Sequence, residues 1–232
     1  MTTAPAEPLT AWRVQFHAPV ASFRDPLFPG VTRGLPVPPP STVRGMLAAA
    51  TGAPAEPVVL GLAAWSEGAG LDTETYHPIA ADGARPAAGG RVPAVKGGMT
   101  IRDRPFLAHL HLTLWLPDPD GSRLTRALRR PRWPLRLGRS QDLVHLTDMT
   151  RVLLEPTKKA SVDHALAPLD GHRVGAANVY RMATTVSADR LTTTWADYLW
   201  CDETTGRRPV HGAYRDSSCS GKEDQAVWLL RP

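Results

Sequence analysis

Alternation of apolar and polar residues predicts strands in two parts of the chain. Residues 11–17 place Trp12, Val14 and Phe16 on one face. Residues 106–116, FLAHLHLTLWL, place four leucines on one face and two histidines, a threonine and a tryptophan on the other. Both segments are therefore predicted to be half-buried strands, and the second shows the pattern more clearly.

Helical spacing replaces alternation between Ser41 and Gly52. The apolar residues that recur at this spacing are Val43, Met46, Leu47 and Ala50. Ser41 is a suitable N-cap, Gly52 is placed to end the helix in a left-handed conformation, and four prolines stiffen the approach. Gly45 inside the helix costs about 1 kcal/mol relative to alanine. Close approach of another backbone or a ligand is expected there.

The middle of the chain predicts a second helix and another long strand. Ser122 is expected to cap RLTRALRR, which Pro131 ends, and a strand follows from about Asp142 to Leu154. Residues 56–65 suit either a short helical turn or a strand.

Two regions depart from these clear elements. Residues 66–103 are rich in glycine, alanine and proline, and residues 73–79 and 92–101 suit the arms of a long projecting hairpin, with a disordered surface loop as the alternative. After Glu155, short predicted strands are separated by polar turns. They cover residues 174–185, 192–200, 209–214 and 226–230.

The order strand, helix, hairpin strand, strand, helix, strand is that of a ferredoxin-like or RRM-like unit. We therefore predict an α+β fold with a ferredoxin-like domain at 11–155, an inserted hairpin at about 66–103, and a small β-rich C-terminal part at 156–232. This topology suits single-stranded RNA, but topology alone does not assign function.

Positive charge is concentrated in one segment. Residues 121–141 hold no acidic residue and seven arginines: Arg123, Arg126, Arg129, Arg130, Arg132, Arg136 and Arg139. Seven exceeds the net charge of +5, so the rest of the 232-residue chain is net negative. The distribution favours an anionic partner on one face, and a solvated arginine face is the alternative.

Motifs for common catalytic and cofactor sites are missing from the sequence. It contains no GxxxxGK[ST], HExxH or CxxC, so no cofactor and no metal are expected. His109 and His111 share a strand face but have no third ligand at useful spacing. Tyr76 and His77, with Lys96 or the pair 158–159, supply residue types for a metal-independent ribonuclease, which is the alternative to a non-enzyme.

The sequence also gives an expectation about location. No apolar run is long enough to span a bilayer, and the N-terminus does not resemble a secretory signal. Cys201 and Cys219 fit a reducing compartment. We expect a cytoplasmic protein with no membrane partner.

Polar and basic residues gather at three predicted element ends: the end of the first strand, the amide end of the first helix, and the turn at residues 138–140. A ferredoxin-like fold would bring these ends close together, and a helix N-terminus favours phosphate. Trp133 is expected either to stack a base or to cover the helix end. The predicted RNA-binding residues are Ser22, Arg24, Arg33, Ser41, Thr42, Arg44, Lys96, Arg132, Arg136, Arg139 and Ser140.

Two separated segments resemble a known family in the expected order. They read ASFRDP…LPVPPPSTVRGMLAAATG, within residues 21–52, and LGRSQDLVHL, residues 137–146. Both resemble the Cas-five family, the CRISPR-associated subunit that caps one end of the guide RNA in Cascade complexes. Elsewhere the likeness is one of layout.

The resemblance implies a RAMP-type fold in which the hairpin at 66–103 is a thumb inserted at the boundary between handle and guide. It implies a non-catalytic subunit of a type I Cascade complex of the I-B-like branch, a ribonucleoprotein of antiviral defence. Such a subunit binds the 5′ handle of the crRNA, joins the large subunit to the backbone subunit, and meets target DNA only indirectly.

Two alternatives to this function remain. One branch of the family cleaves repeat RNA with a tyrosine, lysine and histidine set, but the adjacent lysine–histidine pair of that branch is not evident in this sequence. The alternatives are therefore a repeat-RNA endoribonuclease of the same family and a stand-alone RRM-like RNA-binding module.

Overall fold

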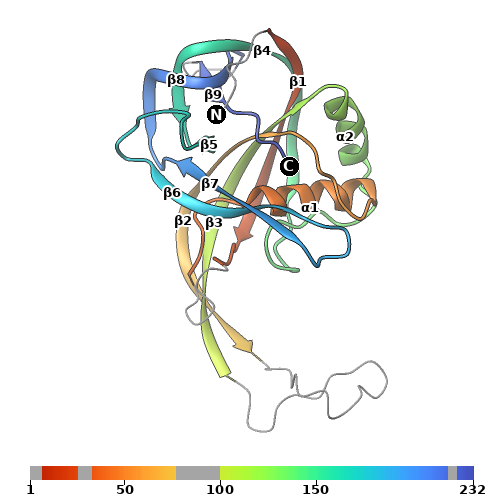
Figure 1. Cartoon of the computed structure of the whole chain (residues 1–232). Helices are drawn as coiled ribbons and strands as arrows, with labels where there is room; N and C mark the ends of the chain where they lie inside the picture. The colour runs from red at the N-terminus through yellow and green to blue at the C-terminus, as the bar shows by residue number, and fades with distance from the viewer. Residues whose placement is uncertain (1–6, 26–32, 77–99, 219–223) are drawn as a thin grey trace.

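The computed structural model describes residues 7–25, 33–76, 100–218 and 224–232. This part of the chain is mostly β, with two helices and a strongly curled sheet (Figure 1). The ferredoxin-like α+β arrangement stays a prediction. The elements in order are β1 Leu9–Ala21, α1 Pro40–Thr51, β2 Gly61–Tyr76, β3 Thr100–Pro117, α2 Asp120–Arg129, β4 His145–Asp163, β5 Ala167–Pro168, β6 Asn178–Val186, β7 Thr193–Trp200, β8 Thr204–Asp216 and β9 Gln225–Val227.

The main sheet has six strands in the order β2-β3-β1-β4-β8-β9. β4 pairs with β1 along its first half and with β8 along its second half, so the sheet turns over along this strand. The chain after β4 then returns to β2, where the Ala64 amide donates to His164 O at 3.1 Å and the Leu166 amide to Leu62 O at 2.8 Å. A smaller sheet, β5-β7-β6, contacts α1 through β6.

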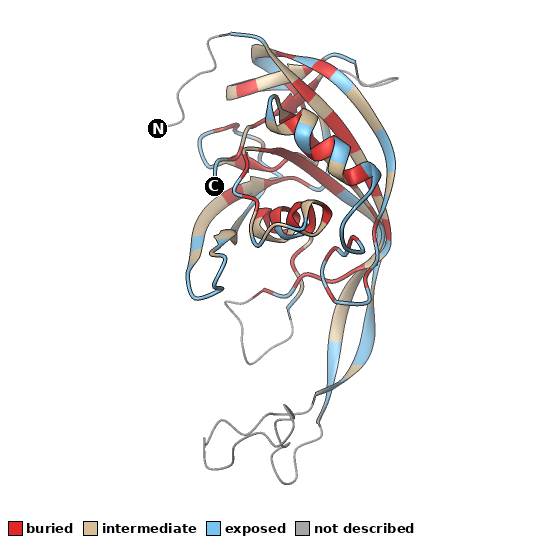
Figure 2. Ribbon diagram, turned by 90° about the vertical axis from the view of Figure 1, so that its right-hand side faces the viewer, coloured by how far each residue is buried: buried red, intermediate tan, exposed pale blue. Residues whose placement is uncertain are grey.

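The helices cover one face of the main sheet (Figure 2). Val14 and Phe16 of β1 lie opposite Leu114 and Leu112 of β3, and all four side chains are buried. The predicted alternation of both strands is thereby confirmed. The intervening residues of each strand point to the opposite face of the sheet. On that face, Gln15 and Thr113 line a cavity together with Asp163 at the end of β4.

The first helix differs from its prediction at one end. It begins at Pro40, and Pro39 is its N-cap without a side-chain hydrogen bond, so the prediction that Ser41 is the cap is wrong. Gly52 ends the helix with φ 78°, as expected. A Cβ added to Gly45 would meet no atom within 4 Å, so the expected close approach is not present within the described chain.

The second helix and the fourth strand are also shifted. α2 begins at Asp120 rather than after Ser122, whose amide and hydroxyl instead donate to the Asp118 carboxylate at 2.9 and 2.6 Å. β4 runs without interruption across residue 155, the predicted end of the first domain. The division into two domains remains a prediction.

The hairpin at the centre of the sequence extends well beyond the body of the molecule (Figure 1). β2 and β3 pair continuously from Gly61–Trp115 to Tyr76–Thr100, so residues 61–65 are strand rather than helix. Residues 77–99, which include Lys96, His77 and most of the second predicted arm, lie outside the described residues. In the described part of the chain, no helix is long and apolar enough to cross a membrane.

Candidate nucleic-acid interface

The end of β1 and the turn before β4 meet at Asp142. Its carboxylate accepts hydrogen bonds from the Ser22 amide at 3.1 Å and from the Arg139 amide at 3.0 Å. Gly138, with φ 112°, completes the turn, and a Cβ there would lie 2.6 Å from Ser22 O. Only glycine fits this position without strain. The close approach of these two segments agrees with the sequence-based expectation.

Arg139 is held inside the fold by two carboxylates. Its Nε donates to Asp142 at 3.1 Å and its Nη1 donates to Asp72 Oδ2 of β2 at 3.1 Å, and the side chain is almost fully buried. Burial lowers the pKa of Arg139, but the bonds to Asp142 and Asp72 outweigh it and raise the pKa. Arg139 therefore anchors the base of the hairpin and is not among the residues that we propose contact RNA.

Ser22 is likewise committed to internal contacts. Its hydroxyl donates to Pro105 O at 2.7 Å and accepts from Arg104 Nε at 3.2 Å, and the residue is buried. Ser22 therefore joins β1 to β3 rather than presenting a hydroxyl to solvent, and we do not propose that it contacts RNA.

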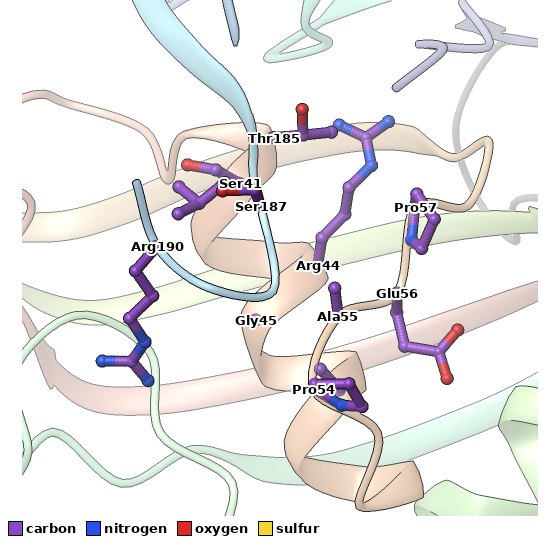
Figure 3. Close-up of a pocket in the computed structure, with 12 residues that line it drawn as sticks. Ser41, Arg44, Gly45, Pro54, Ala55, Glu56, Pro57, Thr185, Ser187 and Arg190 are labelled. Carbon is purple, nitrogen blue, oxygen red and sulfur yellow. The ribbon is translucent and has the colours of Figure 1, made fainter. Parts of the chain in front are cut away.

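Arg44 is buried and joins three distant segments. Its guanidinium donates to Val58 O at 2.9 Å, Thr184 O at 2.6 Å and Leu230 O at 2.9 Å. In Figure 3 the Arg44 side chain extends from α1 toward the strand that carries Thr185. Arg190 lies on the rim of the same cavity, and its side chain points away from Arg44. A phosphate contact would break these bonds, so Arg44 is also outside the proposed contact set.

The amide end of α1 is a poorer anion site than the sequence predicts. Thr42 and Val43 both donate their amides to Pro39 O, at 2.9 and 3.2 Å, and Pro40 has no N–H. Ser41 and Thr42 are half-buried. Ser41 lines a cavity of about 320 Å³ beside β6, and Thr42 lines a separate groove that shares Gly45 with this cavity.

The remaining predicted contacts lie at the surface or outside the described residues. Arg24 and Arg33 are exposed on two short segments that a bridge between Arg24 and Gly34 holds together. Arg132, Arg136 and Ser140 are exposed on the connector after α2. The position of Lys96 is not described.

Five exposed arginines form what we call the arginine surface: Arg126, Arg129, Arg130, Arg132 and Arg136. Arg123 of the same segment is excluded because its guanidinium donates to the Glu56 carboxylate at 2.8 and 2.9 Å and to Asp120 at 3.0 Å. Among the described residues, the five members form no ion pair within 4.0 Å. Their positive charge is therefore directed to solvent.

Trp133 lies among these arginines. Its backbone amide donates to Ala49 O at 3.0 Å, which fixes the connector against the end of α1, but its side chain is 58% exposed. The Arg132 guanidinium carbon lies 5.6 Å from the centre of its ring. Trp133, Arg136 and Thr42 line a groove of about 490 Å³ that runs along the exposed side of Gly45. The groove thus combines one cationic group, Arg136, with a flat exposed ring.

Sequence reasoning missed two features that form only in the folded chain. Asp142 and Asp72 neutralise Arg139, and the only sequence signal was the presence of Asp142 in the segment LGRSQDLVHL. His17 and His145 join His109 and His111 in one cluster, which the spacing along one strand could not reveal. In the described ranges, no three histidine, cysteine or acidic side chains are arranged to hold a metal.

Comparison with known proteins gives a family match over most of the chain. The model of a family described as CRISPR-associated protein (Cas_Cas5) matches residues 13–198. A search of curated proteins gives no match.

Several solved structures show a weaker similarity to this chain. A chain of a CRISPR RNA-guided surveillance complex is 18% identical with a TM-score of 0.49, covering 87% of this chain and 90% of that one. A CRISPR protein from Archaeoglobus fulgidus is 15% identical, with a TM-score of 0.47 over 97% and 100%. A chain of a type III-B Cmr-beta complex bound to cognate target RNA is 11% identical, with a TM-score of 0.46 over 89% and 86%. At this level of similarity we transfer no role to individual residues.

Proposed function

Because this chain belongs to the Cas5 family of CRISPR-associated proteins, we propose that it is a non-catalytic subunit of a type I CRISPR effector complex. In this proposal it binds the 5′ handle of the crRNA in the cytoplasm. It joins the large subunit to the first backbone subunit, and target DNA is recognised indirectly, through pairing with the guide.

The arginine surface is the observation that carries the RNA-binding part of the proposal. Phosphates are bound by cations that are not already paired, and single-stranded bases stack on exposed flat rings. The five arginines of this surface supply the first requirement, and Trp133 in the adjacent groove supplies the second. We propose that the handle follows this groove past α1, where Gly45 leaves room for its backbone.

Strand order supports the finer description of the fold as ferredoxin-like. The elements β1-α1-β2-β3-α2-β4 form a split βαβ arrangement in which every neighbouring pair of strands is antiparallel.

The projecting hairpin supports a contact with a neighbouring subunit. Near the end of its described part, Leu71 and Ile101 are 69% and 70% exposed, so they offer apolar side chains to a partner. Assignment to the I-B-like branch stays a prediction.

Salt dependence of RNA binding tests the role of the arginine surface. We expect the triple variant Arg126→Gln, Arg129→Gln, Arg130→Gln to bind single-stranded RNA more weakly. The affinity falls as salt rises, and each lost phosphate contact reduces the magnitude of the slope of log affinity against log salt by about 0.7. The loss of three contacts should therefore reduce that magnitude by about 2. The matched control replaces the exposed Arg173, Arg181 and Arg208 with glutamine, which removes the same charge elsewhere. Equal slopes for the two triple variants would contradict the proposal.

The non-catalytic assignment needs a separate test. The purified protein is incubated with labelled repeat RNA in the presence of a chelator, and no site-specific product is expected. Cleavage at one site that is lost in His77→Ala would instead establish the ribonuclease alternative.

Co-expression with neighbouring proteins and a CRISPR array, followed by sequencing of co-purified RNA, tests assembly. A stand-alone RNA-binding module would purify without the neighbouring proteins.

A further inference from the structure

A row of flat rings crosses the face of the sheet that lies opposite the helices. Trp65 of β2, His111 of β3, His17 of β1 and His145 of β4 are direct partners in the strand register. The row therefore crosses four adjacent strands, a distance of about 14 Å at the usual strand spacing. His109, with φ 48°, adds a fifth ring beside His17. We call these five residues the ring row.

The rings touch one another and remain open to solvent. The ring centres of Trp65 and His111 are 4.2 Å apart and their planes differ by 12°. The His17 ring centre lies 5.1 Å from those of His111 and His145, and its Nε2 lies 3.2 Å from His109 Nδ1. Trp65 is 37% exposed, and His109 and His145 are exposed. The planes of His17 and His111 differ by 54° and those of His17 and His145 by 66°. The ring row is thus an exposed surface of mutually inclined rings, in which Trp65 and His111 are stacked, rather than part of the core.

The next residues on the same face are polar. Gln15 of β1 lies opposite Thr113 of β3 and Asp148 of β4. These three side chains and Trp65 line a cavity of about 560 Å³, a size typical of ligand sites. The amide of Gln15 and the hydroxyls of Thr113 and Thr150, which also lies on the wall, provide both donors and acceptors.

The far end of this cavity is closed. Arg13 and Trp115 are buried there, and both donate to Asp216 Oδ2 of β8, at 3.0 and 2.8 Å. The face is therefore a groove that is open at the ring row, polar along its floor and closed at Asp216.

We propose that this groove binds unpaired nucleotides of a single-stranded nucleic acid. One base stacks on the face of Trp65 that is opposite the stacked His111 ring, and the edge of that base hydrogen-bonds to Gln15 and Thr113. Four-stranded sheets that carry exposed rings bind two or three bases in this way. The groove lies on the opposite face from the helices, so it is separate from the arginine surface and goes beyond the proposed role in handle binding.

The charges around the groove predict how it binds. Glu67 accepts a hydrogen bond from His111 at 2.8 Å, and Asp148 lies on the cavity wall, so two carboxylates disfavour phosphate close to the rings. Stacking and base-edge hydrogen bonds then provide the affinity, and binding depends only weakly on salt.

The test uses the full chain with Arg126, Arg129 and Arg130 replaced by glutamine, which weakens the proposed handle site and leaves the sheet face unchanged. Fluorescence anisotropy measures binding of labelled eight-nucleotide RNA and DNA strands in buffer with EDTA. Adding Trp65→Ala is expected to weaken the residual affinity by about fivefold to a hundredfold, and Trp65→Phe should keep most of it. Leu191→Ala in the same background is the control, because Leu191 is 85% exposed on the turn between β6 and β7, and it should change the residual affinity little.

Photo-crosslinking locates the bound strand. With 4-thiouridine RNA, crosslinks are expected within residues 61–67 and 107–115. Equal affinity for the RNA and DNA strands indicates recognition of bases alone, and a preference for RNA indicates contact with the 2′-hydroxyl; both support the proposal. Three results would overturn it: no residual binding, residual binding that Trp65→Ala leaves unchanged, or binding that EDTA abolishes. A failure of the proposed handle binding can be distinguished from a failure of this proposal. It would leave the salt slope of the arginine triple variant equal to that of the unmodified protein.

Discussion

Arg44→Met separates a structural role for this arginine from a role in RNA binding. Arg44 is buried and donates to carbonyls of Val58, Thr184 and Leu230, which belong to three parts of the chain that are far apart in sequence. Methionine keeps a long apolar side chain in the same space but removes all three donated hydrogen bonds. The variant therefore tests whether these contacts hold α1 against β6 and the C-terminal segment.

The expected loss of stability follows from the carbonyl oxygens that lose the hydrogen bonds donated by Arg44. Leu230 O still accepts from the Leu60 amide at 3.2 Å, whereas the carbonyls of Val58 and Thr184 lose this donor inside the fold. An unsatisfied buried acceptor costs about 1–3 kcal/mol, so the free energy of unfolding should fall by about 2–6 kcal/mol. Burial already lowers the pKa of Arg44, so the relief of that desolvation cost places the result toward the lower end.

Urea denaturation followed by tryptophan fluorescence measures the effect. A loss of this size lowers the midpoint by about 1–2 M at ordinary m-values. RNA affinity at low temperature, where the variant is folded, should stay within about twofold of the unmodified protein. Arg190→Met is the matched control, because Arg190 is exposed on the rim of the same cavity, and its effect should stay below about 0.5 kcal/mol. An unchanged midpoint together with a smaller salt slope of RNA binding would refute the reasoning.

Three further predictions concern Gly138, Asp216 and His172. Gly138→Ala should lower the free energy of unfolding by about 1–3 kcal/mol in urea denaturation, because φ is 112° and the new Cβ would lie 2.6 Å from Ser22 O. Asp216→Asn should lower it by about 3–5 kcal/mol, because it leaves the buried charge of Arg13 without its carboxylate. Burial lowers the pKa of His172, so the unfolded chain binds more protons below pH 6.5 and thermal stability should fall as the pH drops below that value. In His172→Asn that decline should be shallower.

Each of these predictions has a result that would contradict it. Gly138→Ala with unchanged stability would mean that the turn adjusts without cost, for which Gly175→Ala is a control, since a Cβ there meets no atom within 4 Å. Asp216→Asn is compared with the exposed pair at Asp197, where Asp197→Asn should cost less than about 1 kcal/mol. An identical pH dependence in His172→Asn would mean that His172 is not responsible for the loss of stability in acid.

Local pattern was sufficient for most elements of the fold. Residues 106–116 alternate because one face of β3 packs under the helices, and the register with β1 preserves that alternation. The spacing of Val43, Met46 and Leu47 identified α1, and Gly52 marked its end, because a left-handed residue strongly favours glycine. The start of α1 was misplaced because the rule for serine caps considers only the local sequence, whereas Pro39 and Pro40 determine the first turn.

The sequence by itself determined the two helices and the long strands, the family and the concentration of arginines in residues 121–141. Only the tertiary structure decided which arginines are available. Arg44 meets carbonyls from three distant segments, Arg139 meets Asp72, and Arg123 meets Glu56, whereas Arg126, Arg129 and Arg130 remain exposed. The ring row has the same origin, because its four aligned members come from four strands. The physical reason is that periodicity records which face of an element is buried, but a charge or ring is paired by residues that folding brings from elsewhere in the chain.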